Sequence, residues 1–308
     1  MLIASSTEQF QTPTAIALGN FDGIHQGHQI VLQPIIDGQS QKSGHVCPSV
    51  VSFTPHPREF FTGGQVQLLT PVAEKADLLA SMGIEQLILL PFDRNLASLS
   101  PQQFVEQIIV QQLQARKISV GSDFRFGWQR KGTGEDLRNI AANFGITVQL
   151  NSLHKYQDAD GDAVRVSSSL IKQALLNGEI TAANALLGRP YSLIGEVVSG
   201  QQLGRTIGFP TANIKPPAEK FLPRFGVYAA DVFVDRATVK GVLNIGCRPT
   251  VAGKAATIEV HLLNWSGNLY GQTLKVNLLD FLRPEQKFDS VEELKQQITK
   301  DCQAALNN

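Results

Sequence analysis

Two histidines spaced three residues apart stand in a glycine-rich segment near the start of the chain, ALGNFDGIHQGHQ. The segment follows an expected strand and opens an expected helix, where backbone N–H groups and the helix dipole favour bound phosphate. His25 and His28 would share one face of that helix, while Gly19, Gly23 and Gly27 let the backbone turn tightly. A histidine pair alone is more often a surface feature. In this strand-turn-helix context it predicts a phosphate-binding site.

A second set of polar residues lies in the C-terminal part of the chain, in GQQLGRTIGFPTANI and TIEVHLL. Thr211 and Asn213 offer hard oxygen ligands of the kind that Mg²⁺ prefers. In TIEVHLL, Glu259 alternates with apolar residues, so a strand would place its carboxylate on the face opposite them. Without the neighbouring glycine-rich segment, both features would be interpreted as ordinary loop and strand surface.

A serine cluster, VSSSLIK, begins an expected helix over residues 167–177 that is followed by Gly178. Serine is a favoured N-cap residue, and glycine is favoured just beyond a helix end. Hydroxyl and backbone N–H groups at such a helix start can also bind phosphate. The cluster is therefore either a simple cap beside a solvated Lys172 or a second phosphate-binding element.

The elements that would position these residues are of two kinds. Alternating apolar runs and amphipathic stretches over residues 14–151 predict a parallel sheet covered by helices. Its expected strands are 15–18, 46–53, 86–92 and 118–121, and its expected helices are 25–36, 72–82, 101–115 and 135–145. Short alternating strands then predict an antiparallel barrel or sandwich, with strands at 192–198, 227–234, 238–245, 257–263 and 273–282. A final helix over 289–306 would begin at an N-cap of Asp289 or Ser290.

Composition excludes several classes of protein. The 308 residues carry 27 Lys plus Arg and 27 Asp plus Glu, so no excess positive charge is available for nucleic acid or an anionic membrane. Cys47, Cys247 and Cys302 are widely spaced and form no CxxC pair, which fits neither a disulfide framework nor a zinc site. We find no signal peptide or membrane span, and we expect a cytoplasmic enzyme with reduced thiols.

Taken in order, GNFDGIHQGH, SFTPHPREFF, VGSDFRFGWQRKG, VSSSLIK, GRTIGFPTANI, NIGCRPT and IEVHLL resemble the motifs of bifunctional riboflavin kinase/FAD synthetases. The resemblance implies a Rossmann-like HxGH nucleotidyltransferase domain over residues 1–185, which makes FAD from FMN. It implies a Greek-key β-barrel riboflavin kinase domain with a C-terminal helix over residues 186–308. The resemblance also implies ATP as the co-substrate, Mg²⁺ as the cofactor, and riboflavin, FMN and FAD as substrates or products.

The resemblance also implies roles for individual residues. Catalysis falls to His25 and His28 in adenylyl transfer and to Glu259 as the base of the kinase. Nucleotide binding falls to Gly19, Asn20, Phe21, Asp22, Gly27, Ser167, Ser168, Ser169, Lys172, Gly204, Arg205, Gly208 and Pro210. The flavin would contact Asp123, Phe124, Phe126, Arg283 and Phe288, and the metal would be held by Thr211 and Asn213. For the two phenylalanines of GSDFRFG, plain core packing is an equal alternative.

Several positions depart from the family pattern. Lys172 stands where arginine is usual, which keeps the charge but loses the planar fork that binds phosphate with two hydrogen bonds. Val251 replaces a commoner aromatic residue, and Asn264 and Asn268 replace aspartates. His56, in TPHP, either faces the active site or follows a strand exit stiffened by prolines.

Three other functions stay open on the sequence alone. A monofunctional kinase with a poorly active N-terminal domain is suggested by Lys172, and a flavin-binding sensor without turnover would need neither His28 nor Glu259. A class I aminoacyl-tRNA synthetase shares an HxGH-like signature, but we find no KMSKS-type loop. Oligomeric state is not predicted by any of these patterns.

Overall fold

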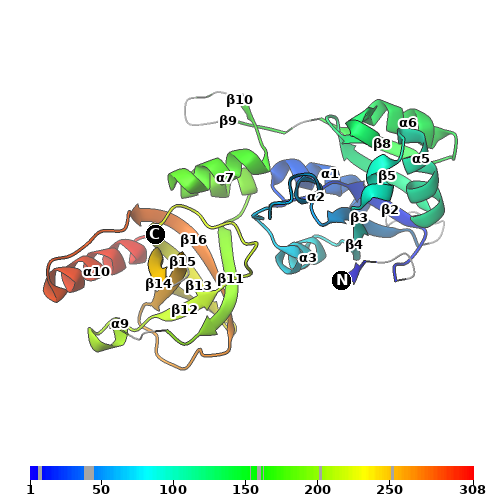
Figure 1. The fold of residues 1–308 in the computed structure, drawn as a ribbon. Coiled ribbons are helices and arrows are strands. Elements are labelled where there is room, and N and C mark those ends of the chain that lie inside the picture. The colour runs from blue at the N-terminus through cyan, green and yellow to red at the C-terminus, as the bar shows by residue number, and fades with distance from the viewer. Residues whose placement is uncertain are drawn as a thin grey trace. The chain divides into compact units, whose positions relative to one another are not determined.

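The computed structural model describes residues 1–5, 9–37, 45–152, 154–157, 161, 163–200, 203–250 and 253–308 (Figure 1). The chain divides into two compact units, Met1–Ser168 and Ser169–Asn308, and each is described by itself. Among the described residues, no helix combines the length and apolar character needed to cross a membrane.

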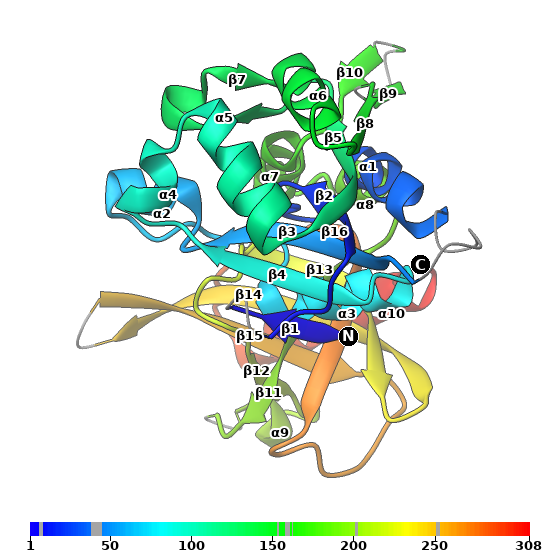
Figure 2. The ribbon, with the colours of Figure 1, turned by 90° about the vertical axis from the view of Figure 1, so that its right-hand side faces the viewer.

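The first unit is built on a six-stranded sheet in which every neighbouring pair of strands is parallel (Figure 2). The strands lie in the order β1 (Leu2–Ala4), β4 (Gln86–Pro91), β3 (Cys47–Thr54), β2 (Thr14–Leu18), β5 (Ala115–Gly121) and β8 (Thr147–Asn151). β2 is central, and its five residues are all buried. The continuous apolar run of β2 predicts a strand that is buried on both faces.

Helices cover both faces of this sheet because successive residues of a strand point to opposite sides. Ala15 and Ala17 pack with α1 (Gln26–Asp37) and α3 (Val72–Ser81). Ile16 and Leu18 face the other core, against η2 (Phe104–Gln112) and α6 (Gly134–Ala142). The smaller elements are α2 (Pro57–Thr62), α4 (Arg94–Ser98), α5 (Pro101–Gln103), β6 (Arg125–Phe126), η3 (Trp128–Arg130), β7 (Gly132–Thr133), β9 (Lys155–Gln157) and β10 (Ala163–Arg165).

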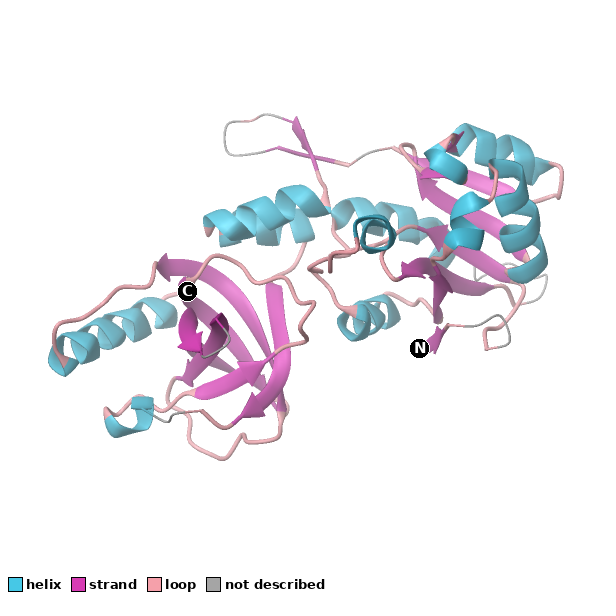
Figure 3. Cartoon of the chain, in the orientation of Figure 1, coloured by secondary structure: helices cyan, strands magenta, loops and turns pink. Residues whose placement is uncertain are grey.

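The second unit is a closed antiparallel barrel preceded by two helices and followed by one (Figure 3). The barrel runs in the order β11 (Tyr191–Val198), β12 (Ala212–Lys215), β15 (Gly253–Leu262), β14 (Ala237–Thr250), β13 (Gly226–Val234) and β16 (Thr273–Arg283). The helices are α7 (Ser168–Asn177), α8 (Ile180–Leu187), α9 (Leu203–Thr206) and α10 (Val291–Leu306).

The C-terminal helix is fixed to the barrel by an apolar contact and a buried ion pair. Ala305 is fully buried among barrel residues that include Val227 and Val242. The Arg283 guanidinium donates to both carboxylate oxygens of Asp301, with its closest contact at 2.8 Å. Two parallel donor-acceptor contacts give this pair a defined geometry.

The predicted fold class is confirmed: a parallel α/β sheet is followed by an antiparallel barrel and a final helix. Ser290 is the N-cap of α10, since its hydroxyl accepts from the Glu293 N–H at 3.2 Å. The sequence reasoning missed α8, and residue 185, the predicted end of the first domain, lies inside that helix. The domain boundary at residues 185 and 186 stays a prediction.

Candidate active sites

The segment between β2 and α1 turns sharply because several of its residues adopt left-handed backbone angles. Phe21, Gly23 and Ile24 have φ values of 48°, 91° and 42°. Only glycine adopts such angles without steric cost, and Phe21 and Ile24 each pay about 1–2 kcal/mol. Both side chains are almost fully buried, which offsets that cost. Strained backbone of this kind concentrates at functional sites.

The two histidines of the turn stack on each other at the start of α1. Their ring centroids are 3.6 Å apart and the planes differ by 16°. His25 lies just before the helix, and its Nδ1 accepts from the backbone N–H of His28 at 3.3 Å. Because Nδ1 is the acceptor, the neutral His25 ring carries its proton on Nε2. Gly27 allows this arrangement, since a Cβ there would lie 3.2 Å from the His25 ring.

The turn is held from outside by three side chains, of which the sequence reasoning selected only Ser168. The Lys75 ammonium donates to the Asn20 carbonyl at 2.6 Å, and the Ser168 hydroxyl donates to the Asp22 carbonyl at 2.7 Å. Thr70 both accepts from the Gly23 N–H at 2.9 Å and donates its own N–H to the Asp22 carboxylate at 3.2 Å. Asn20 and Asp22, both predicted nucleotide contacts, are thus fixed in the turn by specific hydrogen bonds.

Lys75 is an unusual member of this set because its charge is buried. The residue is 6% exposed, and burial lowers the pKa of its ammonium to about 8, although nearby Asp22 raises it. Its only sequence signal is the spacing of the amphipathic helix VAEKADLL, which places Lys75 among buried positions. Shifted pKa values of buried groups are typical of functional sites.

The turn also lies where ligands bind in sheets of this class. From β2 the chain proceeds to β3 and β4 on one side, and β5 is added on the other side of β2. Such a reversal of strand order leaves a crevice at the carboxyl ends of the strands. The segment Gly19–His28 follows the carboxyl end of β2, so its position matches this general rule.

His56 and a group of aromatic side chains lie at the carboxyl ends of neighbouring strands. His56 caps α2 through Nδ1, and its Nε2 lies 3.0 Å from the Asn20 side-chain nitrogen. Thus His56 joins the turn and is not merely part of a proline-stiffened strand exit. Phe60, Phe61 and Phe92 pack edge to face with centroids 5.2–5.8 Å apart. Phe61 is 70% exposed. The sequence shows only that two phenylalanines are adjacent there, and it does not show that one of them is exposed.

The GSDFRFG residues after β5 have different environments. Phe126 is buried in the core with Phe104, and Phe124 stacks on it at 5.7 Å. The Asp123 carboxylate forms an ion pair with Arg165. The structure thus places Phe126 in the core, and the predicted flavin contacts of Asp123, Phe124 and Phe126 stay predictions.

A cavity of about 400 Å³ lies elsewhere in the first unit. Its walls come from the start of the chain, β4, α4 and η2, and include Phe10, Leu90, Asp93, Leu96 and Ile108. None of the predicted site residues lines it, so we assign it no role in catalysis.

In the barrel, the predicted kinase residues come together across adjacent strands. The Thr211 hydroxyl lies 3.4 Å from the Glu259 carboxylate, and Asn213 of β12 is directly opposite Glu259 of β15. Asn244 of β14 is opposite Glu259 on its other side. Directly opposed residues share a face, so Asn213, Glu259 and Asn244 form a row of polar side chains on the barrel wall. The sequence reasoning missed Asn244, because its position opposite Glu259 depends on the strand register, which cannot be read from the sequence.

The loop before β12 also brings backbone close to these side chains. A Cβ at Gly204 would lie 2.3 Å from the Phe209 carbonyl and 3.5 Å from the Thr211 hydroxyl, so this position has room only for glycine. Gly208 has φ of 93°, and the Pro210 carbonyl contacts His261 Nδ1 at 2.7 Å. The side chains of Arg205 and Val251 lie outside the described part of the structure.

The other predicted residues of the second unit have identified neighbours. The Arg283 guanidinium binds Asp301 and lies 5.7 Å from the centroid of the Phe288 ring. The Lys172 ammonium lies 5.6 Å from the centroid of Phe221. Their flavin-binding and phosphate-binding roles, and those of Ser167 and Ser169, stay predictions.

The first unit has a strained turn with stacked histidines at a helix start. The second unit has a barrel wall where a carboxylate lies beside hydroxyl and amide groups. Together these two sites define a two-domain transferase that uses nucleotides. Comparison with known proteins gives the particular family. Residues 7–170 match the FAD synthetase family and residues 187–308 match the riboflavin kinase family.

Curated relatives match nearly the whole chain. Bifunctional riboflavin kinase/FMN adenylyltransferases from Pseudomonas fluorescens and Escherichia coli K12 are 39% and 38% identical, covering 94% of this chain and 90% and 91% of theirs. This chain belongs to the bifunctional riboflavin kinase/FMN adenylyltransferase family. It is an enzyme with both activities: the N-terminal domain converts FMN to FAD, and the C-terminal domain converts riboflavin to FMN.

A solved structure from Streptococcus pneumoniae, described as a macrolide-efflux protein, is 32% identical with a TM-score of 0.87, covering 100% of this chain and 99% of that one. The two family matches and the curated relatives agree with each other, and we take the activity from them. The resemblance stated from the sequence motifs is thereby confirmed, and the monofunctional, sensor and synthetase alternatives are set aside.

Proposed function

We propose that FMN adenylylation takes place at the turn between β2 and α1. The observation that carries this assignment is the stacked pair His25 and His28 at the start of a helix, beside a turn held by Lys75. Backbone N–H groups and the positive end of α1 would bind the ATP phosphates. The predicted nucleotide contacts of Gly19, Asn20, Phe21, Asp22 and Gly27 belong to the same segment.

The chemistry needs positioning and charge stabilisation more than a base. An ionised phosphate oxygen of FMN bonds to the α-phosphorus of ATP, while the bond from that phosphorus to the oxygen bridging to the β-phosphate breaks. His25 and His28 would donate hydrogen bonds to the oxygens on which negative charge increases as pyrophosphate leaves. His25 can do so through Nε2, since its Nδ1 is already an acceptor.

The exposed aromatic group at the carboxyl ends of β3 and β4 supports a place for the flavin ring. Phe60, Phe61 and Phe92 offer flat apolar surface next to α2, and His56 links that helix to Asn20. Aromatic rings pack favourably edge to face or offset on one another. A flavin on Phe61 would therefore cover apolar surface that is otherwise exposed to water.

We propose that riboflavin phosphorylation takes place on the barrel wall at Glu259. The riboflavin nucleophile is a neutral alcohol, so its proton must leave as the oxygen bonds to the γ-phosphorus of ATP and the bond to ADP breaks. The Glu259 carboxylate would accept that proton. Its half-buried place beside Thr211 keeps it close to the loop that would hold the phosphates.

The same residues fit a magnesium ion. Thr211 and Asn213 supply only oxygen ligands, and Mg²⁺ usually takes a few such ligands together with water and substrate phosphates. A Cβ at Gly204 would lie 3.5 Å from the Thr211 hydroxyl, so the loop backbone passes close to this ligand. When bound, Mg²⁺ neutralises phosphate charge, and the protein residues orient the nucleotide. We also propose a cytoplasmic enzyme that acts on small molecules without nucleic acid.

The test is to separate the flavins by chromatography after incubation with ATP and Mg²⁺, starting once from riboflavin and once from FMN. Glu259→Gln should abolish FMN formation and leave conversion of supplied FMN to FAD nearly intact. His28→Ala should do the reverse. A still-folded variant that loses both reactions would contradict the assignment of one reaction to each site.

Matched controls distinguish site effects from general ones. Glu196→Gln changes an exposed carboxylate on barrel strand β11 and should leave FMN formation unchanged. His45→Ala removes an exposed imidazole at the amino end of β3 and should leave FAD formation unchanged. Omission of Mg²⁺ should stop both reactions in every variant.

A further inference from the structure

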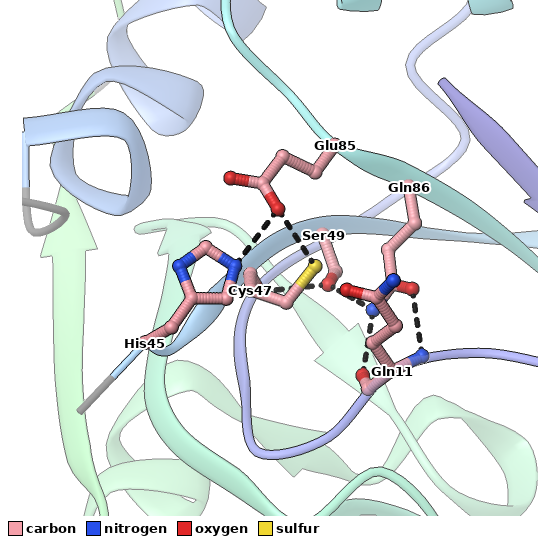
Figure 4. A network of polar contacts seen from close by, with 6 residues as sticks. All are labelled: Gln11, His45, Cys47, Ser49, Glu85 and Gln86. Atoms are coloured by element: carbon pink, nitrogen blue, oxygen red, sulfur yellow. Dashed lines mark hydrogen bonds and ion pairs between the residues drawn. The ribbon is translucent and has the colours of Figure 1, made fainter.

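Three side chains with metal-ligating atoms meet at the end of the sheet opposite the adenylylation site (Figure 4). The Glu85 carboxylate lies 2.9 Å from His45 Nε2 and 3.5 Å from Cys47 Sγ, through the same oxygen. One ligand atom from each residue lies within 4.8 Å of the others. Cys47 begins β3, whereas the histidine turn follows the carboxyl end of the neighbouring strand. Thr14, at the start of that five-residue strand, is opposite Cys47, so about 13 Å of strand separates the cluster from the start of the turn.

Two of the three side chains stand on firmly held backbone. The Cys47 N–H donates to the Pro13 carbonyl at 2.9 Å, and the Glu85 N–H donates to the Pro48 carbonyl at 3.0 Å. The Glu85 carbonyl accepts from the Leu2 N–H at 2.9 Å. Positions fixed in this way keep two ligands in place before any ion arrives, which lowers the entropic cost of binding.

A buried polar network supports the same strands (Figure 4). The Gln86 amide donates to the Ser49 hydroxyl at 2.8 Å and to the Gln11 carbonyl at 2.9 Å. The Ser49 hydroxyl in turn donates to the Cys47 carbonyl at 2.8 Å. These hydrogen bonds hold the strand backbone that carries Cys47.

The chemistry of the three ligands selects the type of ion. A nitrogen, a sulfur and a single carboxylate suit Zn²⁺ and similar transition metals, whereas Mg²⁺ and Ca²⁺ prefer oxygen ligands throughout. Cys47 is 2% exposed, but the His45 and Glu85 side chains are 61% and 38% exposed. The cluster therefore has a buried anchor and an open side where water can complete four ligands.

The cysteine is unsuited to thiol chemistry in the absence of a metal. Burial and the neighbouring Glu85 carboxylate raise the pKa of the Cys47 thiol to about 12. A protonated thiol is a poor nucleophile, so the structure gives Cys47 no catalytic role. An ion would bind the thiolate and displace the proton to solvent.

We propose that His45, Cys47 and Glu85 bind one Zn²⁺-type ion, separate from the Mg²⁺ of the nucleotide sites. The ion would tie the segment that leads into β3 to the start of β4. The cysteine spacing predicted no zinc site, because these ligands lie at or just before the starts of two strands and only one of them is cysteine. The proposal is independent of the proposed catalytic residues.

The test uses Co²⁺ as a spectroscopic probe on the full chain, with excess Mg²⁺ and no nucleotide. We expect one Co²⁺ per chain with a sulfur-to-metal charge-transfer band and the visible bands of tetrahedral cobalt, both removed by added Zn²⁺. Cys47→Ser should abolish the charge-transfer band, and Cys247→Ser and Cys302→Ser should leave it unchanged. A wild-type protein without the band, or a band retained in Cys47→Ser, would overturn the proposal.

His45→Ala keeps the test decisive if the buried Cys47 variant fails to fold. It removes an exposed ligand and should weaken Co²⁺ binding at least about tenfold while leaving FMN and FAD formation unchanged. Zn²⁺ should also raise the melting temperature of the wild type more than that of His45→Ala. Equal Co²⁺ affinity in the two proteins would exclude His45 as a ligand and overturn the site.

Discussion

The buried ammonium of Lys75 leads to a prediction about both stability and activity. Its pKa is lowered from the ordinary 10.5 to about 8, first because of burial. At pH 7 this lowering corresponds to a cost of about 3 kcal/mol for keeping the charge in the folded state. The same charge holds the Asn20 carbonyl at 2.6 Å. Lys75→Met should therefore remove this stability cost, and it should also remove the hydrogen bond that holds Asn20 in the adenylylation turn.

The pH dependence follows from proton binding. Between about pH 8 and 10.5 the unfolded chain carries the proton on Lys75 and the folded protein has lost it, so stability rises with pH. From pH 7 to 9.5 this residue should add about 2 kcal/mol to the free energy of unfolding of the first unit. Lys75→Met should lack that increment, and the difference between the two proteins is the quantity to measure.

The assay is urea unfolding at pH 7 and 9.5, followed by tryptophan fluorescence. Trp128 is the tryptophan of the first unit, so Trp265→Phe gives a background in which the signal reports that unit alone. Lys117→Met is a matched control, because Lys117 also donates to a backbone carbonyl, that of Pro34 at 2.8 Å, but is only half-buried.

In the same variant, FAD formation should fall about tenfold or more, since a hydrogen bond to a charged group contributes about 1.5–3 kcal/mol. FMN formation should be unchanged. If Lys75→Met showed the same pH dependence of stability as wild type, the buried charge would not be the cause. If it retained full FAD formation, Lys75 would not position the turn.

Three further predictions follow from single contacts. Gly27→Ala should lower FAD formation about tenfold and leave FMN formation unchanged, because the new Cβ would lie only 3.2 Å from the His25 ring. Equal effects on the two rates would contradict this prediction. Arg283→Met should lower the free energy of unfolding of the barrel by about 3–5 kcal/mol in urea, because it leaves the 5%-exposed Asp301 carboxylate without its partner. A loss below 1 kcal/mol would show that the pair is only a surface contact. Phe61→Ala should raise the KM for FMN about three- to tenfold with little change in melting temperature, and an unchanged KM would remove the flavin from this surface.

Much of the fold could be predicted from local sequence patterns. Period-two alternation in TIEVHLL placed Glu259 opposite Ile258 and Val260, and the structure buries both apolar residues while leaving Glu259 half-buried. The glycine-rich turn was found because strand, turn and helix follow one another directly in the chain. Such features depend on neighbours within a few residues, which a sequence displays.

The remaining parts depend on contacts between distant residues. Lys75 reaches Asn20 across 55 positions, and Asn244 meets Glu259 only through the register of β14 and β15. His45 and Cys47 are near each other in the sequence, but Glu85 joins them because β3 and β4 are neighbours. Periodicity predicts the face on which a side chain lies, but it does not predict which side chain of another element will be opposite.

The closure of the barrel has a consequence for synthesis on the ribosome. β11 pairs with β16, for example through Tyr191 opposite Leu278. The barrel therefore cannot close until β16, its last strand in the sequence, has been synthesised. All pairings of the six-stranded sheet lie between residues 2 and 151. The emerging chain can therefore complete the sheet early, whereas the barrel strands stay exposed to chaperones and misassembly until nearly the whole polypeptide has left the exit tunnel.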